Sequence, residues 1–165
     1  MGLPICLERE EMSAGLRSRI EAFLQAHHVM SLATSGPEGP WSAAVFYASD
    51  GLTLYFVSAP GSRHSRDIEA SGRAAATIHR DVGDWREVRG IQLEGEAARV
   101  GGTERAAALA RYARKFPLIA DLTSAPREIA AAMARMEWYR LSPRRVRLVD
   151  NTLGFGHREE LDAAT

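Results

Sequence analysis

The stretch Leu52-Thr53-Leu54-Tyr55-Phe56-Val57-Ser58, followed by Ala59-Pro60-Gly61-Ser62, decides the fold. Its first seven residues are rich in the aromatic and β-branched types that favour a strand, and the Pro-Gly pair ends that strand. Residues 63–71 then read as a short helix, closed by Gly72 in the position that commonly follows a helix end. The pattern therefore predicts a strand, a tight turn and a short helix.

Further strands are predicted on both sides of this unit. Residues 36–40 form a Gly-Pro turn between two of them, and Ser49-Asp50-Gly51 is a hairpin turn. The run 41–48 is mostly apolar, so we expect it to be covered on both faces. Gly95 predicts a bulge or bend inside its strand. The additional strands are expected at 29–35, 41–48, 74–79, 89–100, 138–141 and 145–150.

Three further helices complete the pattern. Residues 13–27 carry an apolar stripe at helical spacing, formed by Leu16, Ile20, Phe23 and Leu24. A second helix opens at Thr103 and ends at Pro117, and a third follows Pro126. The tail around His157 is charged and is expected to be exposed.

Strands and helices do not alternate regularly, which argues against a doubly wound parallel sheet. A small antiparallel barrel with flanking helices fits better. We therefore predict a mainly β fold with α-helices and a single domain over residues 1–165, with its core at about 13–156.

Composition excludes several classes of function. Lys+Arg and Asp+Glu are both 21, so the chain lacks the basic excess typical of nucleic-acid binding. A single cysteine, Cys6, allows neither an intramolecular disulfide nor a thiolate metal cluster. We see no signal peptide and no membrane span, and expect a cytoplasmic protein with no metal site.

The segment 57–66 carries the strongest chemical signal. A strand delivers Ser58 to a turn, and Arg63 and His64 follow at the start of a helix, where free N–H groups attract anions. Together with Ser62 or Ser65, these groups are suited to bind a phosphate. The alternative is a capped helix with two solvated charges.

Other motifs are weaker. His27-His28 is either a metal or acid–base site or a pair at a helix end. Neither a nucleophile elbow nor a dinucleotide-binding glycine motif occurs. The run Asp150-Asn151-Thr152-Leu153-Gly154-Phe155-Gly156 is either a turn that packs Leu153 and Phe155 on the core or a segment that lies against a flat ligand or a partner subunit.

With these motifs in place, the chain resembles the pyridoxamine 5'-phosphate oxidase-like split β-barrel flavoproteins from about Ser13 to Gly156. The resemblance rests on residues 41–47, 54–58 and 61–64, and residues 150–156 are similar to a small bacterial subgroup. It implies a six-stranded antiparallel Greek-key split barrel. It also implies a homodimer with FMN at the interface.

The resemblance also implies cofactor-binding residues. The second strand would run beside the flavin ring and offer backbone groups, while the turn after the third strand would hold the phosphate. The family often has Lys where this chain has His64, which loses its proton near pH 6.5 when unperturbed. The implied set is Ser42, Ala44, Val45, Val57, Ser58, Arg63, His64, Gln92 and Asn151.

From these observations we expect an FMN-dependent oxidoreductase that acts on a small-molecule substrate, with no identifiable catalytic side chain. Arg145-Val146-Arg147 lacks the histidine that the oxidase proper uses for its substrate, so vitamin B6 oxidation is disfavoured. The alternatives are a flavin or haem carrier or sensor, with His27, His28 or His64 as iron ligand, and a deazaflavin-dependent reductase.

Overall fold

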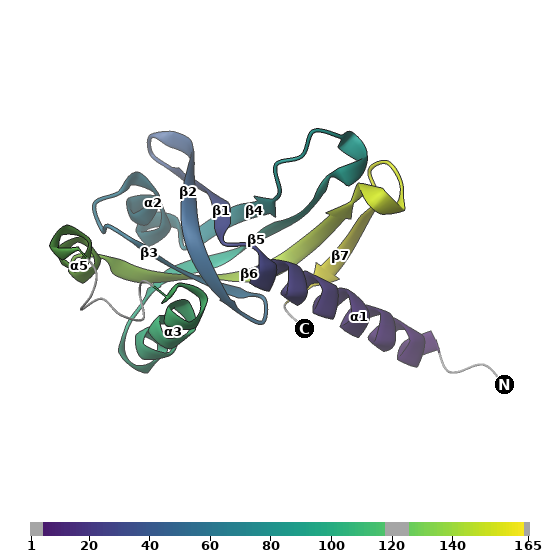
Figure 1. Ribbon diagram of the computed structural model, residues 1–165, viewed down its shortest axis with the longest axis horizontal. Coiled ribbons are helices and arrows are strands. Elements are labelled where there is room, and N and C mark those ends of the chain that lie inside the picture. Colours follow the sequence, from purple (N-terminus) through teal and green to yellow (C-terminus); the bar gives the residue numbers. More distant parts are fainter. Residues whose placement is uncertain (1–4, 118–125, 164–165) are drawn as a thin grey trace.

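The computed structural model describes residues 5–117 and 126–163, with strands at the centre and helices around them (Figure 1). The elements are α1 (Ile5–Ala26), β1 (Val29–Gly36), β2 (Gly39–Asp50), β3 (Thr53–Ser58), α2 (Arg63–Ser71), β4 (Arg73–His79), η1 (Trp85–Glu87), β5 (Arg89–Val100), α3 (Gly102–Lys115), α5 (Arg127–Ala134), β6 (Glu137–Asp150), η2 (Asn151–Leu153) and β7 (Arg158–Asp162). The described ranges confirm a mainly β fold with flanking helices.

Six strands close into an antiparallel barrel. Their order is β3-β2-β1-β4-β5-β6, and β3 also pairs with β6, which closes the ring. All of these pairings are antiparallel. The six-stranded antiparallel barrel predicted from the sequence is therefore confirmed, and β7 extends the sheet at the edge of β6.

Alternate side chains of the strands fill the barrel interior. The rings of Phe56 and Tyr139 stack there with centroids 5.5 Å apart. Helix α1 buries Ile20 and Leu24 in the same cluster, which confirms the predicted stripe. The helix nevertheless begins at Ile5 rather than near Ser13, because the polar residues before the stripe are good helix formers.

The expected distortion at Gly95 is present. The register between β5 and β6 shifts between Glu94 and Gly95. A β-carbon at Gly95 would overlap the carbonyl oxygen of Ser142, so the two strands approach too closely for any side chain there. Glycine therefore allows β6 to bend while it stays paired with β5.

Two strand predictions need correction at the C-terminus. Residues 137–150 form one continuous strand instead of two, because Pro143 sits at the bulge opposite Gly95, where no ladder hydrogen bond is lost. The segment after His157 forms β7 rather than a tail. Its Leu161 is 5% exposed and packs in the core. The charged residues around Leu161 are the reason that the sequence predicted an exposed tail.

The outer face of β2 also differs from expectation, since it is open in this chain rather than covered. Helix α3 covers β2 near the Asp50 end, where Ala48 and Tyr112 are buried, and Phe116 at its C-terminal cap meets the ring of Phe46 edge-on at 5.5 Å. Farther along the same face of β2, the side chain of Phe46 is 57% exposed; Trp41 is 44% exposed but lies on the opposite face, because side chains alternate along the strand. None of the described helices is long and apolar enough to span a bilayer.

Candidate functional site

Strands β2 and β3 pair only near their hairpin and then separate. The last pair is Tyr47 with Phe56. Beyond it, β2 continues beside β1 and β3 continues beside β6, so each strand has one edge without a strand partner in the described ranges. We call the two edges, residues 40–46 of β2 and residues 57–58 of β3, the split of the barrel.

The register shows which backbone groups point into the split. The N–H of Tyr47 donates to the carbonyl of His28 at 3.0 Å, on the β1 side of β2. Because backbone directions alternate along an antiparallel strand, Val45 also points its backbone groups toward β1, whereas Ala44 points its groups into the split. The same alternation turns the backbone of Val57 into the split. Ala44 and Val57 thus direct their backbone groups into the split, whereas Val45 directs its groups toward β1.

A cluster of hydroxyl and imidazole groups lies where β3 ends and α2 begins. Ser58 Oγ is 3.0 Å from Ser62 Oγ and 2.6 Å from His64 Nε2. Ser62 caps α2, accepting a hydrogen bond from the Ser65 N–H at 3.3 Å and donating to Ser65 Oγ at 2.9 Å. Ser58 and Ser65 are buried, so the cap of α2 is part of a partly buried network of polar side chains. We call these four residues the hydroxyl cluster.

The surroundings of the imidazole in the hydroxyl cluster favour its neutral form. Burial lowers the pKa of His64, and the carboxylate of Asp67 on the same helix opposes this shift only in part. The positive end of the α2 dipole lies at the same place. An anion bound here would therefore meet hydroxyl groups, helix N–H groups and a neutral imidazole.

Arg63 supplies a permanent positive charge beside this cluster. Its Nη2 donates to the carbonyls of Glu38 at 2.6 Å and Gly39 at 3.2 Å, in the turn between β1 and β2. Its guanidinium carbon lies 4.9 Å from the centroid of the Trp41 ring. Its buried Nε has no hydrogen-bond partner in the part of the chain that the structure describes. The guanidinium is thus held against the barrel, with hydrogen-bonding capacity left over.

Trp41 is the residue of this region that sequence reasoning did not select. The sequence did offer a signal for Trp41: it is an aromatic residue directly before Ser42, in the strand expected beside the flavin. Ser42 itself is exposed on the same outer face of β2 as Ala44.

A buried carboxylate fixes α2 against β1. Thr34 Oγ1 donates to Asp67 Oδ2 at 2.8 Å, and both side chains are buried. A β-carbon at Gly36 would overlap Asp67 Oδ1, so glycine is required for this approach. The position of the hydroxyl cluster therefore depends on a contact between α2 and the end of β1.

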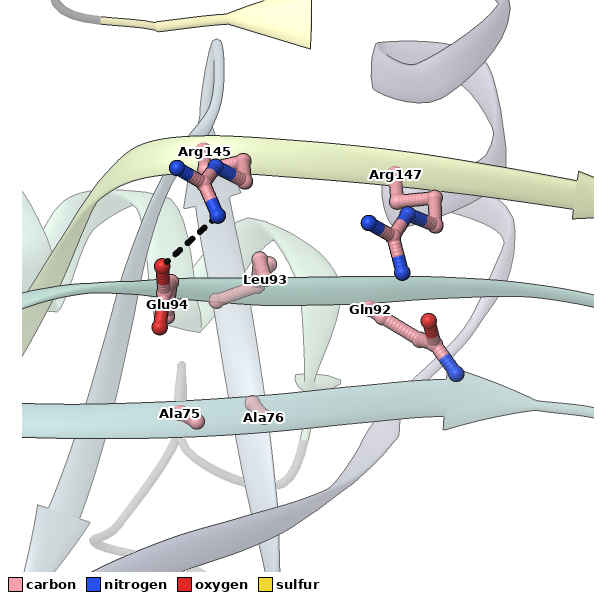
Figure 2. Close-up of a pocket in the computed structure, with 7 residues that line it drawn as sticks. All are labelled: Ala75, Ala76, Gln92, Leu93, Glu94, Arg145 and Arg147. Carbon is pink, nitrogen blue, oxygen red and sulfur yellow. Dashed lines mark ion pairs between the residues drawn. The ribbon is translucent and has the colours of Figure 1, made fainter. Parts of the chain in front are cut away.

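Gln92 lies on the outer face of the sheet and does not reach the hydroxyl cluster within one chain. Figure 2 shows its side chain near Arg147, in a depression where Arg145 also pairs with Glu94 at 3.6 Å. The registers of β5, β4 and β1 place Gln92 in the same cross-strand row as Ala44, three strands away. Within a single chain, Gln92 therefore lies apart from the candidate phosphate-binding residues Ser58, Arg63 and His64.

Asn151 is bonded within the C-terminal turn, which we define as residues 150–156. Its Nδ2 donates to the Trp85 carbonyl at 2.7 Å, and its Oδ1 accepts from the Gly156 N–H at 3.0 Å. The alternative in which this turn packs Leu153 and Phe155 on the core is wrong, because these side chains are 59% and 83% exposed. Phe155 instead meets the ring of Trp85 edge-on at 5.3 Å.

The paired histidines favour the helix-end interpretation. His27 Nδ1 is 2.8 Å from the Phe23 carbonyl, and its ring stacks on that of Phe23 at 3.9 Å. The exposed His28 meets Phe116 edge-on at 5.8 Å. Within residues 5–117 and 126–163, no group of three or more His, Cys, Asp or Glu side chains is arranged to hold a metal ion.

A closed six-stranded barrel with a split next to a capped helix defines the pyridoxamine 5'-phosphate oxidase-like split-barrel class. The family profile described as pyridoxamine 5'-phosphate oxidase matches residues 16–150, and the chain belongs to this family. A UPF0306 protein from Serratia proteamaculans is 31% identical over 142 residues, which cover 85% of this chain and 90% of that protein.

Two solved structures extend the comparison. A heme binding protein from Mycobacterium smegmatis is 25% identical with a TM-score of 0.67, covering 87% of this chain and 57% of that one. HutZ, the heme storage protein from Vibrio cholerae, is 17% identical with a TM-score of 0.61, covering 76% of this chain and 88% of its own. The second likeness shows the fold alone.

Proposed function

We propose that this protein is a homodimeric FMN-binding protein that acts as a flavin-dependent oxidoreductase on a small-molecule substrate. One observation carries the proposal: the hydroxyl cluster and Arg63 lie next to the split, where β2 and β3 leave backbone groups without a strand partner among the described residues. An anion site and a row of hydrogen-bonding groups thus adjoin each other, as a phosphorylated flat cofactor requires.

The phosphate would be held at the N-terminus of α2. Ser58 and Ser62 offer hydroxyl groups whose hydrogens can rotate toward a new acceptor. Arg63 offers a guanidinium, which binds phosphate oxygens through charge-assisted hydrogen bonds. Its buried Nε, which has no partner in the described ranges, fits the presence of a further acceptor.

The flavin ring would lie along β2. Ala44 and Val57 direct backbone groups into the split, and a flavin carries hydrogen-bond donors and acceptors along its ring. The exposed ring of Trp41, which contacts Arg63, provides a flat surface nearby. Bound FMN would supply the redox chemistry, while the chain would anchor the phosphate, orient the ring and control access.

The open face of β2 supports the homodimer. Phe46 is exposed on this face, and so is Val29, at 43%, opposite Phe46 on β1. Exposed aromatic and aliphatic groups of this kind mark protein interaction sites. Light scattering should give a dimer mass, and Phe46→Glu should shift it to the monomer, whereas Leu109→Glu on α3 should not.

The direct test is the absorption spectrum of the purified protein after loading with FMN and removal of excess ligand. We expect retained flavin that a nicotinamide donor can reduce. Ser58→Ala should lose most of the flavin, whereas Ser18→Ala on the exposed face of α1 should retain it, because Ser18 bonds only within its own helix. Absence of retained flavin together with absence of FMN binding by calorimetry would reject the proposal.

Haem binding is the second candidate, and the likeness to the heme binding protein from Mycobacterium smegmatis favours it. In this chain the accessible ligand would be His28, because His64 is bonded to Ser58 and His27 to the Phe23 carbonyl. Phe116 and the exposed Phe46 lie beside it. A Soret band that His28→Ala abolishes would favour haem over flavin.

A further inference from the structure

We propose that His64 couples cofactor binding to proton uptake, so that the protein binds the phosphate of FMN more tightly as pH falls through neutrality. This inference rests on the proposed function and concerns the regulation of the same site. A lysine at this position would give an anchor that is always charged near neutral pH, whereas His64 gives one that titrates.

Hydrogen counting fixes the tautomer of His64. The single hydroxyl hydrogen of Ser62 is donated to Ser65 Oγ. The single hydrogen of Ser58 then goes to Ser62 Oγ at 3.0 Å or to the Ala59 carbonyl at 3.5 Å. The contact between Ser58 Oγ and His64 Nε2 at 2.6 Å then requires a hydrogen on Nε2. Neutral His64 thus carries its proton on Nε2, and Nδ1 is the nitrogen that takes up a second one.

The surroundings of His64 keep this second proton off in the absence of an anion. Half-burial removes water from the imidazole, the positive end of the α2 dipole points at it, and Arg63 adds a positive charge from the preceding position. Asp67 is the acidic group on the same helix that favours protonation, but burial outweighs it in setting the pKa of His64.

Acidic groups on neighbouring elements are already paired. Glu38, in the turn between β1 and β2, pairs with Arg66 of α2 at 3.2 Å. Glu137, the cross-strand partner of Ser58 on β6, pairs with Arg99 at 2.6 Å. Neither carboxylate is therefore available as a dedicated partner for an imidazolium.

A bound phosphate changes this balance. It brings a charge of about −1.5 to −2 at neutral pH, with a second pKa of about 6, to the site that holds His64. The phosphate favours the imidazolium, so FMN binding takes a proton from solvent onto Nδ1. By linkage, affinity then rises as pH falls, by up to about tenfold per pH unit between the pKa values of His64 in the unbound and bound protein.

The experiment is a fluorescence titration of flavin-stripped protein with FMN and with riboflavin, at about pH 6.5, 7.5 and 8.5, a range that keeps the phosphate mostly dianionic. We expect the Kd for FMN to be about tenfold lower at the acid end than at the alkaline end. Riboflavin lacks the phosphate, so its Kd should change less than about twofold over the same range.

Variants assign the effect to one residue. His64→Lys should bind FMN with little pH dependence, and His64→Gln should bind it more weakly at the acid end and also without pH dependence. His79→Gln, at the exposed end of β4, should retain the wild-type profile. Binding of FMN with a Kd independent of pH in the wild type, or a profile unchanged in His64→Gln, would overturn the inference and leave FMN binding intact. Absence of FMN binding at every pH would instead reject the proposed function and this inference with it.

Discussion

The turn before α2 and the C-terminal turn have similar compositions but different bonding. Both follow the end of a barrel strand, and both combine hydroxyl groups, glycine and a nearby aromatic residue. In the turn before α2, Ser58, Ser62 and His64 bond mainly to one another, and the nearby Arg63 keeps a buried Nε without a partner in the described ranges.

In the C-terminal turn, polar side chains bond mostly to backbone groups or a fixed charge. Asp150 accepts hydrogen bonds from the N–H and Oγ1 of Thr152 and pairs with Arg89 Nε at 3.0 Å. Asn151 uses both ends of its amide on backbone groups. Bonds between hydroxyl groups can be exchanged for bonds to a ligand, whereas bonds that close a turn cannot be given up without unfolding it. The comparison thus separates a binding region from a structural one.

The largest effect on the first region is expected from Gly36→Ala. The new β-carbon would overlap Asp67 Oδ1, so α2 must move away from β1 or lose the bond to Thr34. We expect a loss of about 1–3 kcal/mol in the free energy of unfolding, measured by urea denaturation, and a parallel loss of FMN binding. Gly61→Ala is the matched control, because a β-carbon there meets nothing within 4 Å. A stable Gly36→Ala protein that binds FMN normally would contradict the role of this contact.

Arg63→Gln should separate binding from stability. Loss of a charge-assisted contact to phosphate costs about 1.5–3 kcal/mol, so the Kd for FMN should rise about 10- to 100-fold. Riboflavin affinity and the urea midpoint should change less, because within the described ranges the guanidinium contacts the carbonyls of Glu38 and Gly39 and the partly exposed Trp41 ring. Calorimetry with both ligands measures the difference. Equal losses for FMN and riboflavin would show that Arg63 does not bind the phosphate.

Asn151→Ala should show the opposite pattern. The substitution leaves the Trp85 carbonyl and the Gly156 N–H without their partner, and we expect the free energy of unfolding to fall by about 1 kcal/mol. FMN affinity in the folded dimer should change less than that of Arg63→Gln. A large loss of FMN affinity at unchanged stability would move Asn151 into the binding region.

The smallest expected effects are in the pH dependence of stability. Burial raises the pKa of Asp150, but hydrogen bonds from Thr152 and the charge of Arg89 outweigh it, so the pKa lies below its usual value of 3.8. The stability that Asp150 contributes is present above that value and is lost as pH falls through the lower pKa. Asp150→Asn should therefore lose less of its free energy of unfolding than the wild type does between neutral pH and the most acid pH.

His64 affects stability at higher pH than Asp150 does, because folding favours its neutral form. Its pKa lies below the usual value of 6.5 because of burial, so the protein without ligand loses stability as pH falls below that value. His64→Gln should remove this loss, measured by thermal unfolding across the acid range. An unchanged thermal profile would show that the hydroxyl cluster does not constrain the imidazole.

The sequence predicts most of the fold because strong local signals coincide with it. Proline, glycine and period-2 patterns locate β1 to β5, and the helix 63–71 with Gly72 in the left-handed conformation is confirmed. Strand β7 is missed because its alternation consists of charged residues around a single buried leucine. The continuity of β6 is missed because Pro143 reads as a strand end unless its partner Gly95 is known.

The candidate site is less predictable, because it depends on contacts between distant segments. Local spacing identifies Ser58, Arg63 and His64 as a group, and the structure brings Ser58 and His64 into contact. Spacing cannot show that the Arg63 guanidinium lies on Trp41, or that the Asn151 amide donates to the Trp85 carbonyl, since both depend on tertiary packing.

A crystal structure of the protein with FMN tests the central claim most directly. We predict that the phosphate lies at the N-terminus of α2, within hydrogen-bonding distance of Ser58 or Ser62 and of Arg63, with the flavin ring beside Ala44 in the split. A phosphate bound elsewhere, with Ser58 still bonded to His64 and Arg63 still bonded to the carbonyls of Glu38 and Gly39, would contradict it.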